Sequence, residues 1–147
     1  MKKGGKKRMI VIVCVDEEYG MMFHGRRQSQ DRALIKDVAE ECQGRMLYMN
    51  ARSVPLFEEY GDIPVTVRED YMEGAGEGEY CFAEDADLRE CPKGLEGVIL
   101  YRWNRRYPAD LRFGLDLTDG GWELVRTEEF RGFSHERITK EVYRRIR

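Results

Sequence analysis

The sequence predicts an α/β protein whose central sheet is mostly parallel and ends in an antiparallel hairpin. Its first apolar run, residues 9–15, is rich in β-branched residues at both odd and even positions. Such a run is typical of a strand buried on both faces, as in parallel sheets. Strands alternate with helical patterns over the first half of the chain. The second half holds strands alone, which favours antiparallel strands added at the end of the sheet.

The first half of the chain begins with a strand, a loop and a helix. A polar loop is expected at 16–30, and Asp31 then provides an N-cap for a helix that runs to about Cys42. A second strand at 45–49 leads into a short helix with Pro55 in its first turn. Because ligands usually bind at the loop that leaves a central strand of such a sheet, the loop at 16–30 is the first candidate for a site.

The remaining strands are predicted from apolar runs and from the alternation of apolar and polar residues. The segment 111–117 alternates strictly, and 68–78 is a loop with room for one helical turn. We expect inner strands at 11–15, 46–49 and 98–101. With 9–15 and 45–49 the predicted strands number eight, the other six being 63–67, 79–83, 98–103, 111–117, 122–126 and 138–145.

Composition and charge favour one domain at 9–147, preceded by a basic leader at 1–8 that we expect to be disordered. No apolar run approaches the length of a membrane span, and no cleavable signal is visible. The net charge of −3 argues against a dedicated nucleic-acid surface. The four cysteines are scattered and there are only two histidines, so no metal site is expected, and reduced thiols favour a cytoplasmic protein.

Several stretches together resemble the dihydrofolate reductase family. Residues 11–21 resemble its first strand and the glycine-containing mobile loop behind it, and 45–53 resemble the strand and turn before its second helix. The segments 122–130 and 138–145 resemble the closing hairpin and are the closest match. The resemblance implies a three-layer fold around an eight-stranded sheet. By spacing, it places Asp31 at the acid that contacts the pterin.

The departures from the family pattern concern the cofactor. The basic Gly-Arg-x-Thr turn that holds a cofactor phosphate is replaced by Asn-Ala-Arg-Ser at 50–53. Arg-Trp-Asn at 102–104 stands where the family has the Gly-Gly whose backbone meets the pyrophosphate. Bulky side chains at such a point block the close approach of a phosphate. We therefore predict a divergent dihydrofolate reductase-like protein without standard reductase activity, in which NADPH binding is disfavoured.

Asp31 is the candidate catalytic residue. A carboxylate at the mouth of the cleft would hydrogen-bond the edge of a ligand ring or relay a proton, and an N-cap role is compatible with both. His24, in the preceding loop, is a second polar candidate or else an ordinary exposed loop histidine. Met21 would cover a ligand as part of a lid or else pack into the core. Trp103 beside Asn104 would stack on a ligand ring or else act as an ordinary sheet residue.

Arginines occur in three places that the predicted fold brings to one end of the sheet: the first loop, the turn after the second strand and the end of the fifth strand. Arginine pairs bidentately with phosphate and carboxylate, so the three places together predict an anion site. The alternative is that these arginines pair with acidic side chains on the surface. The ligand-binding candidates in these places are Arg26, Arg27, Asn50, Arg52, Ser53 and Arg102.

Three functions follow from these observations. The favoured one is the binding of a small anionic molecule or nucleotide in the cleft, without standard reductase activity. The alternative is an NADPH-dependent reductase of a pterin-like or other small substrate. A weaker alternative is an RNA-acting protein of the ribonuclease Z type, but the histidine-rich metal motif of that family is absent, because His24 and His135 stand alone.

Overall fold

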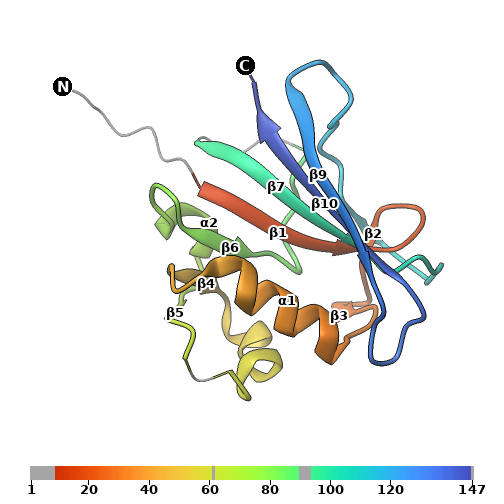
Figure 1. The fold of residues 1–147 in the computed structure, drawn as a ribbon, viewed down its shortest axis with the longest axis horizontal. Coiled ribbons are helices and arrows are strands. Elements are labelled where there is room, and N and C mark those ends of the chain that lie inside the picture. The colour runs from red at the N-terminus through yellow and green to blue at the C-terminus, as the bar shows by residue number, and fades with distance from the viewer. Residues whose placement is uncertain (1–8, 61, 90–93, 147) are drawn as a thin grey trace.

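A computed structural model of the protein describes residues 9–60, 62–89 and 94–146. The expected leader at 1–8 and Cys91 lie outside the described residues. The predicted fold class is confirmed, because one large mixed sheet runs through the described residues (Figure 1). Its seven strands, in spatial order, are β5 (Val65–Val67), β4 (Leu47–Met49), β6 (Tyr80–Phe82), β1 (Met9–Val15), β7 (Leu95–Arg102), β10 (Ile138–Arg145) and β9 (Trp122–Phe130).

The order of the strands follows from their apolar patterns. β1 lies in the middle because it is apolar on both faces: Val11 and Val13 belong to the core on one side, and Ile12 belongs to the core on the other. The neighbours from β5 to β7 pair in parallel, whereas β10 is antiparallel to both β7 and β9. The inner positions predicted for β1, β4 and β7 are confirmed, since each has a strand on both sides.

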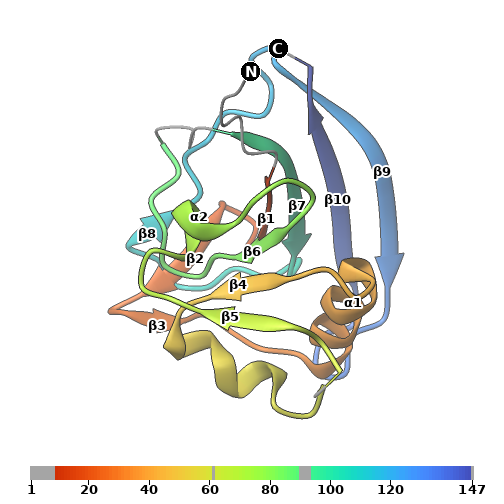
Figure 2. The same ribbon diagram turned by 90° about the vertical axis from the view of Figure 1, so that its left-hand side faces the viewer.

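One face of the sheet is covered by α1 (Arg32–Cys42) and by η1 (Ala51–Phe57), which is a 3-10 helix (Figure 2). The predicted N-cap is confirmed, because Oδ1 of Asp31 accepts a hydrogen bond from the N–H of Ala33 at 2.9 Å. The apolar side of α1 packs on the sheet through Leu34, Ile35 and Val38. This packing brings the start of α1 to the carboxyl ends of β1 and β7.

The opposite face is covered mainly by irregular segments and by one helical turn, α2 (Tyr71–Gly74). The prediction of a strand at 111–117 is wrong for most of its length, because only β8 (Leu111–Arg112) is a strand. The alternating apolar residues of this segment do pack against the core, but the backbone lies across the face of the sheet. The main sheet of the described residues therefore has seven strands in place of the expected eight.

The loop expected at 16–30 is also partly wrong. It contains β2 (Gly20–Phe23) and β3 (Arg26–Arg27), which pair antiparallel and form a small second sheet with β8. Sequence patterns miss such short strands, because two to four residues are too few to show the alternation of apolar and polar residues. The small sheet ties the loop down beside the end of β1.

The closing hairpin is confirmed, and it is longer than predicted. β9 and β10 pair antiparallel from Ile138 opposite Phe130 to Arg145 opposite Trp122. The turn between them, residues 131–137, reaches the start of α1, where it forms hydrogen bonds with Asp31. No helix in the described part of the chain has the length and apolarity needed to cross a bilayer.

Candidate functional site

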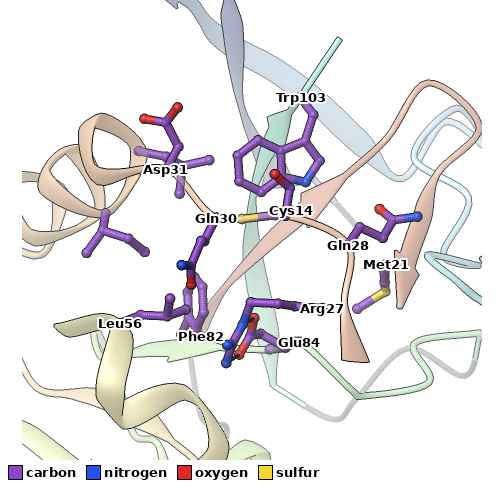
Figure 3. Close-up of a pocket in the computed structure, with 14 residues that line it drawn as sticks. Cys14, Met21, Arg27, Gln28, Gln30, Asp31, Leu56, Phe82, Glu84 and Trp103 are labelled. Carbon is purple, nitrogen blue, oxygen red and sulfur yellow. Dashed lines mark hydrogen bonds and ion pairs between the residues drawn. The ribbon is translucent and has the colours of Figure 1, made fainter. Parts of the chain in front are cut away.

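A small cavity lies at the carboxyl ends of β1, β6 and β7, where ligands bind in sheets of this kind. Its free volume is about 20 Å³, which is room for about one water molecule. Figure 3 shows how closely side chains from the strands, the loop and the two helices approach one another there. The residues lining it are Cys14, Met21, Arg27, Gln28, Ser29, Gln30, Asp31, Leu34, Ile35, Leu56, Phe82, Ala83, Glu84 and Trp103.

The carboxylate of Asp31 is buried and fully occupied by hydrogen bonds. Oδ1 accepts from the N–H groups of Ala33 at 2.9 Å and Phe133 at 2.8 Å. Oδ2 accepts from the N–H of Ser134 at 2.8 Å and its hydroxyl at 3.2 Å, and it lies 2.9 Å from Nδ1 of His135. Burial by itself would raise the pKa of Asp31, but the N–H donors and the imidazole together hold it well below its ordinary value. The predicted contact of this carboxylate with a ligand stays a prediction.

His135 connects Asp31 to two hydroxyl groups. Its Nε2 lies 3.0 Å from Oγ of Ser29 and 3.1 Å from the hydroxyl of Tyr107. Its ring stacks on Trp103, with 4.5 Å between centroids and 27° between planes. Trp103 therefore does stack on a ring, but on one that belongs to the protein. Local sequence patterns do not reveal this contact, because His135 lies 104 positions from Asp31 in the chain.

A second polar network joins the loop after β1 to the turn after β4. The guanidinium of Arg27 donates to both oxygens of Glu84, at 2.6 and 2.9 Å, and to the carbonyl of Arg52 at 2.9 Å. The Ser53 hydroxyl donates to Glu84 at 2.7 Å. The hydrogen bonds to Glu84 and its negative charge raise the pKa of Arg27, although burial alone would lower it. The Arg27 side chain thus meets the backbone of Arg52, and a half-buried carboxylate already neutralises Arg27.

The neighbouring residues of this turn have local partners as well. The amide of Asn50 donates to Asp85 at 2.8 Å, and its own oxygen is buried with no hydrogen-bond partner in the described part of the chain. The guanidinium of Arg52 donates to the carbonyl of Gly25 and lies 3.9 Å from the sulfur of Met22. Arg52 therefore holds the loop at 16–30 in place, and Asn50 holds the segment after β6. Neither residue lines the cavity.

Of the other predicted ligand-binding residues, Met21 lines the cavity, and Arg102, Asn104, His24 and Arg26 lie away from it. Arg102 donates to Glu141 at 2.9 Å and to the hydroxyl of Tyr19 at 3.0 Å, so it does not meet Arg27. Asn104 donates to the hydroxyl of Thr139 at 2.9 Å on β10. The His24 ring stacks on its neighbour Phe23 with 3.8 Å between centroids, and Arg26 is exposed. Met21 is buried at 4 % exposure, so it packs in the core while lining the cavity.

A wider groove continues outward from the cavity, between α1, η1 and the turn at 131–137. Its volume is about 420 Å³, and it shares Gln30, Asp31, Ile35 and Leu56 with the cavity. The groove is mixed in character, since apolar side chains and two glutamates line it. Its further lining residues are Arg32, Pro55, Glu58, Glu59, Tyr60, Phe133 and Ser134.

A basic hollow adjoins the groove on the outer side of α1. Arg32, Lys36 and Arg131 all line it, together with Tyr60 and Phe133, and among the described residues no acidic side chain does. The guanidinium of Arg32 stacks over the exposed Phe133 ring at 5.1 Å from the centroid.

Sequence reasoning missed this basic hollow. The spacing of Arg32 and Lys36, four residues apart, was a readable signal that both occupy one face of the helix. Their meeting with Arg131 depends on the position of the hairpin turn. Among the described residues, no group of three or more histidine, cysteine or acidic side chains is arranged to hold a metal ion.

Comparison with known proteins gives a fold. No protein-family model matches the chain, and no curated protein matches it. Among solved structures, dihydrofolate reductase from Enterococcus faecalis, complexed with NADP(H) and RAB-propyl, is similar with a TM-score of 0.65. The match covers 97% of this chain and 98% of that chain at 14% sequence identity. The chain therefore has a dihydrofolate reductase-like fold, and at this identity the likeness establishes the fold alone.

Proposed function

We propose that the protein binds a small anionic molecule in the groove between α1, η1 and the turn at 131–137. The observation that carries this proposal is the basic hollow, in which Arg32, Lys36 and Arg131 line one space without an acidic side chain. Within the described residues, none of the three forms an ion pair with an acid. All three positive charges attract an anion that enters the hollow, and the anion reduces the repulsion between them.

The groove suggests the shape of the rest of the ligand. Ile35, Pro55 and Leu56 line it and would pack against an aromatic or aliphatic body. Glu58 and Glu59, which follow η1, also line it and would repel a negative charge beside them. The anionic group therefore belongs over the basic hollow, and the apolar body belongs toward Leu56. An aromatic carboxylate, an aromatic phosphate or a nucleotide has this pattern.

This position differs from the one we expected from the sequence. An anion at Arg27 would have to displace Glu84, and one at Arg102 would have to displace Glu141. Breaking a partly buried ion pair leaves a carboxylate without its partner, which costs about 3–5 kcal/mol when the site is buried. The three cations of the hollow require no such displacement, so we place the anion there.

The same arrangement argues against standard reductase chemistry. The Asp31 carboxylate, which the family resemblance assigns to the pterin, is occupied by five hydrogen bonds within the protein. Trp103 places an indole at the end of β7, where the family has Gly-Gly. We therefore propose that NADPH binds weakly, with a binding free energy no more favourable than about −5 kcal/mol, and that no pterin is reduced.

The test of the anion site is a thermal-shift series in chloride, inorganic phosphate and phenyl phosphate at equal ionic strength. A ligand at a hundred times its dissociation constant stabilises the folded state by about 2.7 kcal/mol. For a chain of 147 residues this raises the melting temperature by about 9 °C. We expect the order phenyl phosphate, phosphate, chloride, because only phenyl phosphate fills both the hollow and the groove.

The matched variants separate this site from general surface charge. Lys36→Gln combined with Arg131→Gln should remove most of the response to both phosphates. Arg112→Gln, which removes an exposed arginine of β8, should keep it. Equal melting temperatures of the wild type in all three salts would refute the anion site. Saturable NADPH binding at low micromolar concentration, with oxidation of NADPH by dihydrofolate, would establish the reductase alternative instead.

A further inference from the structure

Ser29, His135 and Asp31 are arranged as a nucleophile, a general base and an orienting acid. The Ser29 hydroxyl lies 3.0 Å from Nε2 of His135, and Nδ1 of the same ring lies 2.9 Å from Oδ2 of Asp31. Both distances are within the range of hydrogen bonds in nucleophile–base–acid triads. This arrangement lies outside the groove's basic hollow, and the inference drawn from it does not depend on anion binding.

The hydrogen bond to Asp31 fixes the tautomer of His135. Because the Asp31 carboxylate is an acceptor, Nδ1 of His135 donates to it, and Nε2 is left to accept a hydrogen bond. The Trp103 ring stacks against the imidazole and holds its plane. The side chains of His135 and Asp31 are 3 % and 0 % exposed. The base is therefore oriented toward hydroxyl groups and shielded from bulk water.

The nucleophile is accessible where the base is not. Ser29 is half-buried and lines the cavity at the ends of β1, β6 and β7. Its neighbours Gln30 and Asp31 line both this cavity and the outer groove. The groove is therefore lined by the two residues that follow Ser29 in the chain, whereas Ser29 itself lines only the cavity. The free volume of the cavity, about 20 Å³, is room for about one water molecule, so the side chains that line it have to move before an acetyl group can reach Ser29.

We propose that Ser29 is a nucleophile activated by His135 and that the protein transfers short acyl groups from carboxylic esters to water. In the first step, the Ser29 oxygen bonds to the ester carbonyl carbon while its proton passes to Nε2 of His135. The carbon–oxygen bond to the alcohol or phenol then breaks, and that leaving group takes the proton from His135. Water attacks the acyl-serine with the same base, which releases the carboxylic acid and restores the hydroxyl.

Tyr107 has a supporting position in this arrangement. Its hydroxyl lies 3.1 Å from the same Nε2, so it competes with Ser29 for one lone pair. Removing it by Tyr107→Phe leaves Ser29 as the remaining hydroxyl at Nε2 and should raise the rate of Ser29 acylation or leave it unchanged. A purely structural role of the network, in which His135 only ties the turn to α1, predicts no acylation at Ser29 in any variant.

The experiment uses p-nitrophenyl acetate and the full chain at pH 8. We expect an acetyl group on Ser29 in the folded protein, located by peptide mass spectrometry, and none at this residue in urea. His135→Gln should slow acetylation of Ser29 by about 100-fold or more, and Ser29→Ala should abolish the p-nitrophenolate burst. Acetylation confined to lysines, or an unchanged Ser29 rate in folded His135→Gln, would overturn the proposal.

A second measurement keeps the test sharp if His135→Gln does not fold. Ser29→Cys replaces the hydroxyl with a thiol, and a thiol beside an accepting imidazole forms a thiolate at lower pH than a free thiol. We expect iodoacetamide at pH 6.5 to alkylate the introduced thiol at least about 10-fold faster in the folded protein than in urea. Equal or slower alkylation in the folded protein would show that His135 does not activate the group at this position.

Discussion

Asp31→Asn tests how much the buried carboxylate stabilises the fold. Asparagine has a similar shape, so its one side-chain oxygen can still accept from Ala33 and Phe133. Its amide group then faces the N–H of Ser134, which is left without an acceptor. An unsatisfied buried N–H costs about 1–3 kcal/mol, and two hydrogen bonds that lose their charged acceptor weaken by roughly 1 kcal/mol each.

The sum is a loss of about 3–5 kcal/mol in the free energy of unfolding. With an unfolding entropy of about 2.1 cal/mol/K per residue, 147 residues convert this into a fall of about 10–16 °C in melting temperature. The assay is urea denaturation at pH 7 followed by circular dichroism. Asp110→Asn is the matched control, because its carboxylate accepts from the N–H of His24 at an exposed position. We expect that control to lose less than about 0.5 kcal/mol.

The dependence on pH gives the same prediction a second signature. The pKa of Asp31 is lower in the folded state than in the unfolded chain, so its stabilising effect is complete above the unfolded value of about 3.9. As the pH falls below that value toward the folded pKa, the effect is lost. The gap between wild type and Asp31→Asn should therefore be constant above about pH 5 and shrink below about pH 4. A gap under about 1 kcal/mol at pH 7, or one that does not shrink in acid, would refute this reasoning.

Two further predictions concern packing and thiol chemistry. Gly132→Ala should destabilise the protein by about 1–3 kcal/mol in the same urea assay, because the added Cβ would lie 2.6 Å from Oδ2 of Asp31 and 2.7 Å from the carbonyl of His135. Gly76→Ala is the control, because its Cβ would meet only the flexible Glu79 side chain. It should change the free energy of unfolding by less than about 1 kcal/mol. Burial raises the pKa of the Cys42 thiol to about 12. Iodoacetamide at pH 8 should therefore modify Cys42 at least about 100-fold more slowly in the folded protein than in urea, and comparable rates in the two conditions would contradict the buried position of this thiol.

The parts of the fold that the sequence predicted are those with strong local patterns. The residues of β1 are apolar at both odd and even positions, which predicts a central strand. Asp31 directly precedes a segment with apolar residues at helical spacing, which predicts an N-cap. Neither prediction needs long-range information. The segment 111–117 shows the limit of this reasoning. Its alternation reports one buried side, and a segment lying across a sheet face buries one side just as a strand does.

The candidate site was less predictable because its contacts are long-range. The sequence pointed to the loop after β1 and to Arg27, Asp31 and Trp103, all of which line the cavity. It gave no partner for His135, which meets Asp31 only because the hairpin turn folds back over α1. The arginines were assigned to an anion by residue type, whereas Glu84 and Glu141 are brought to Arg27 and Arg102 by the packing of the sheet.

The hydrogen bonds between Asp31 and the hairpin turn also bear on how fast the protein folds and unfolds. They join residues 102 to 104 positions apart in the chain, so closing this loop has a large entropic penalty until the sheet has formed. We therefore expect these contacts to form after the rate-limiting step of folding. Contacts that form late slow unfolding and leave the folding rate nearly unchanged. The contacts of the turn at 131–137 then lower the unfolding rate, so that removing them shortens the lifetime of the folded state without slowing its formation.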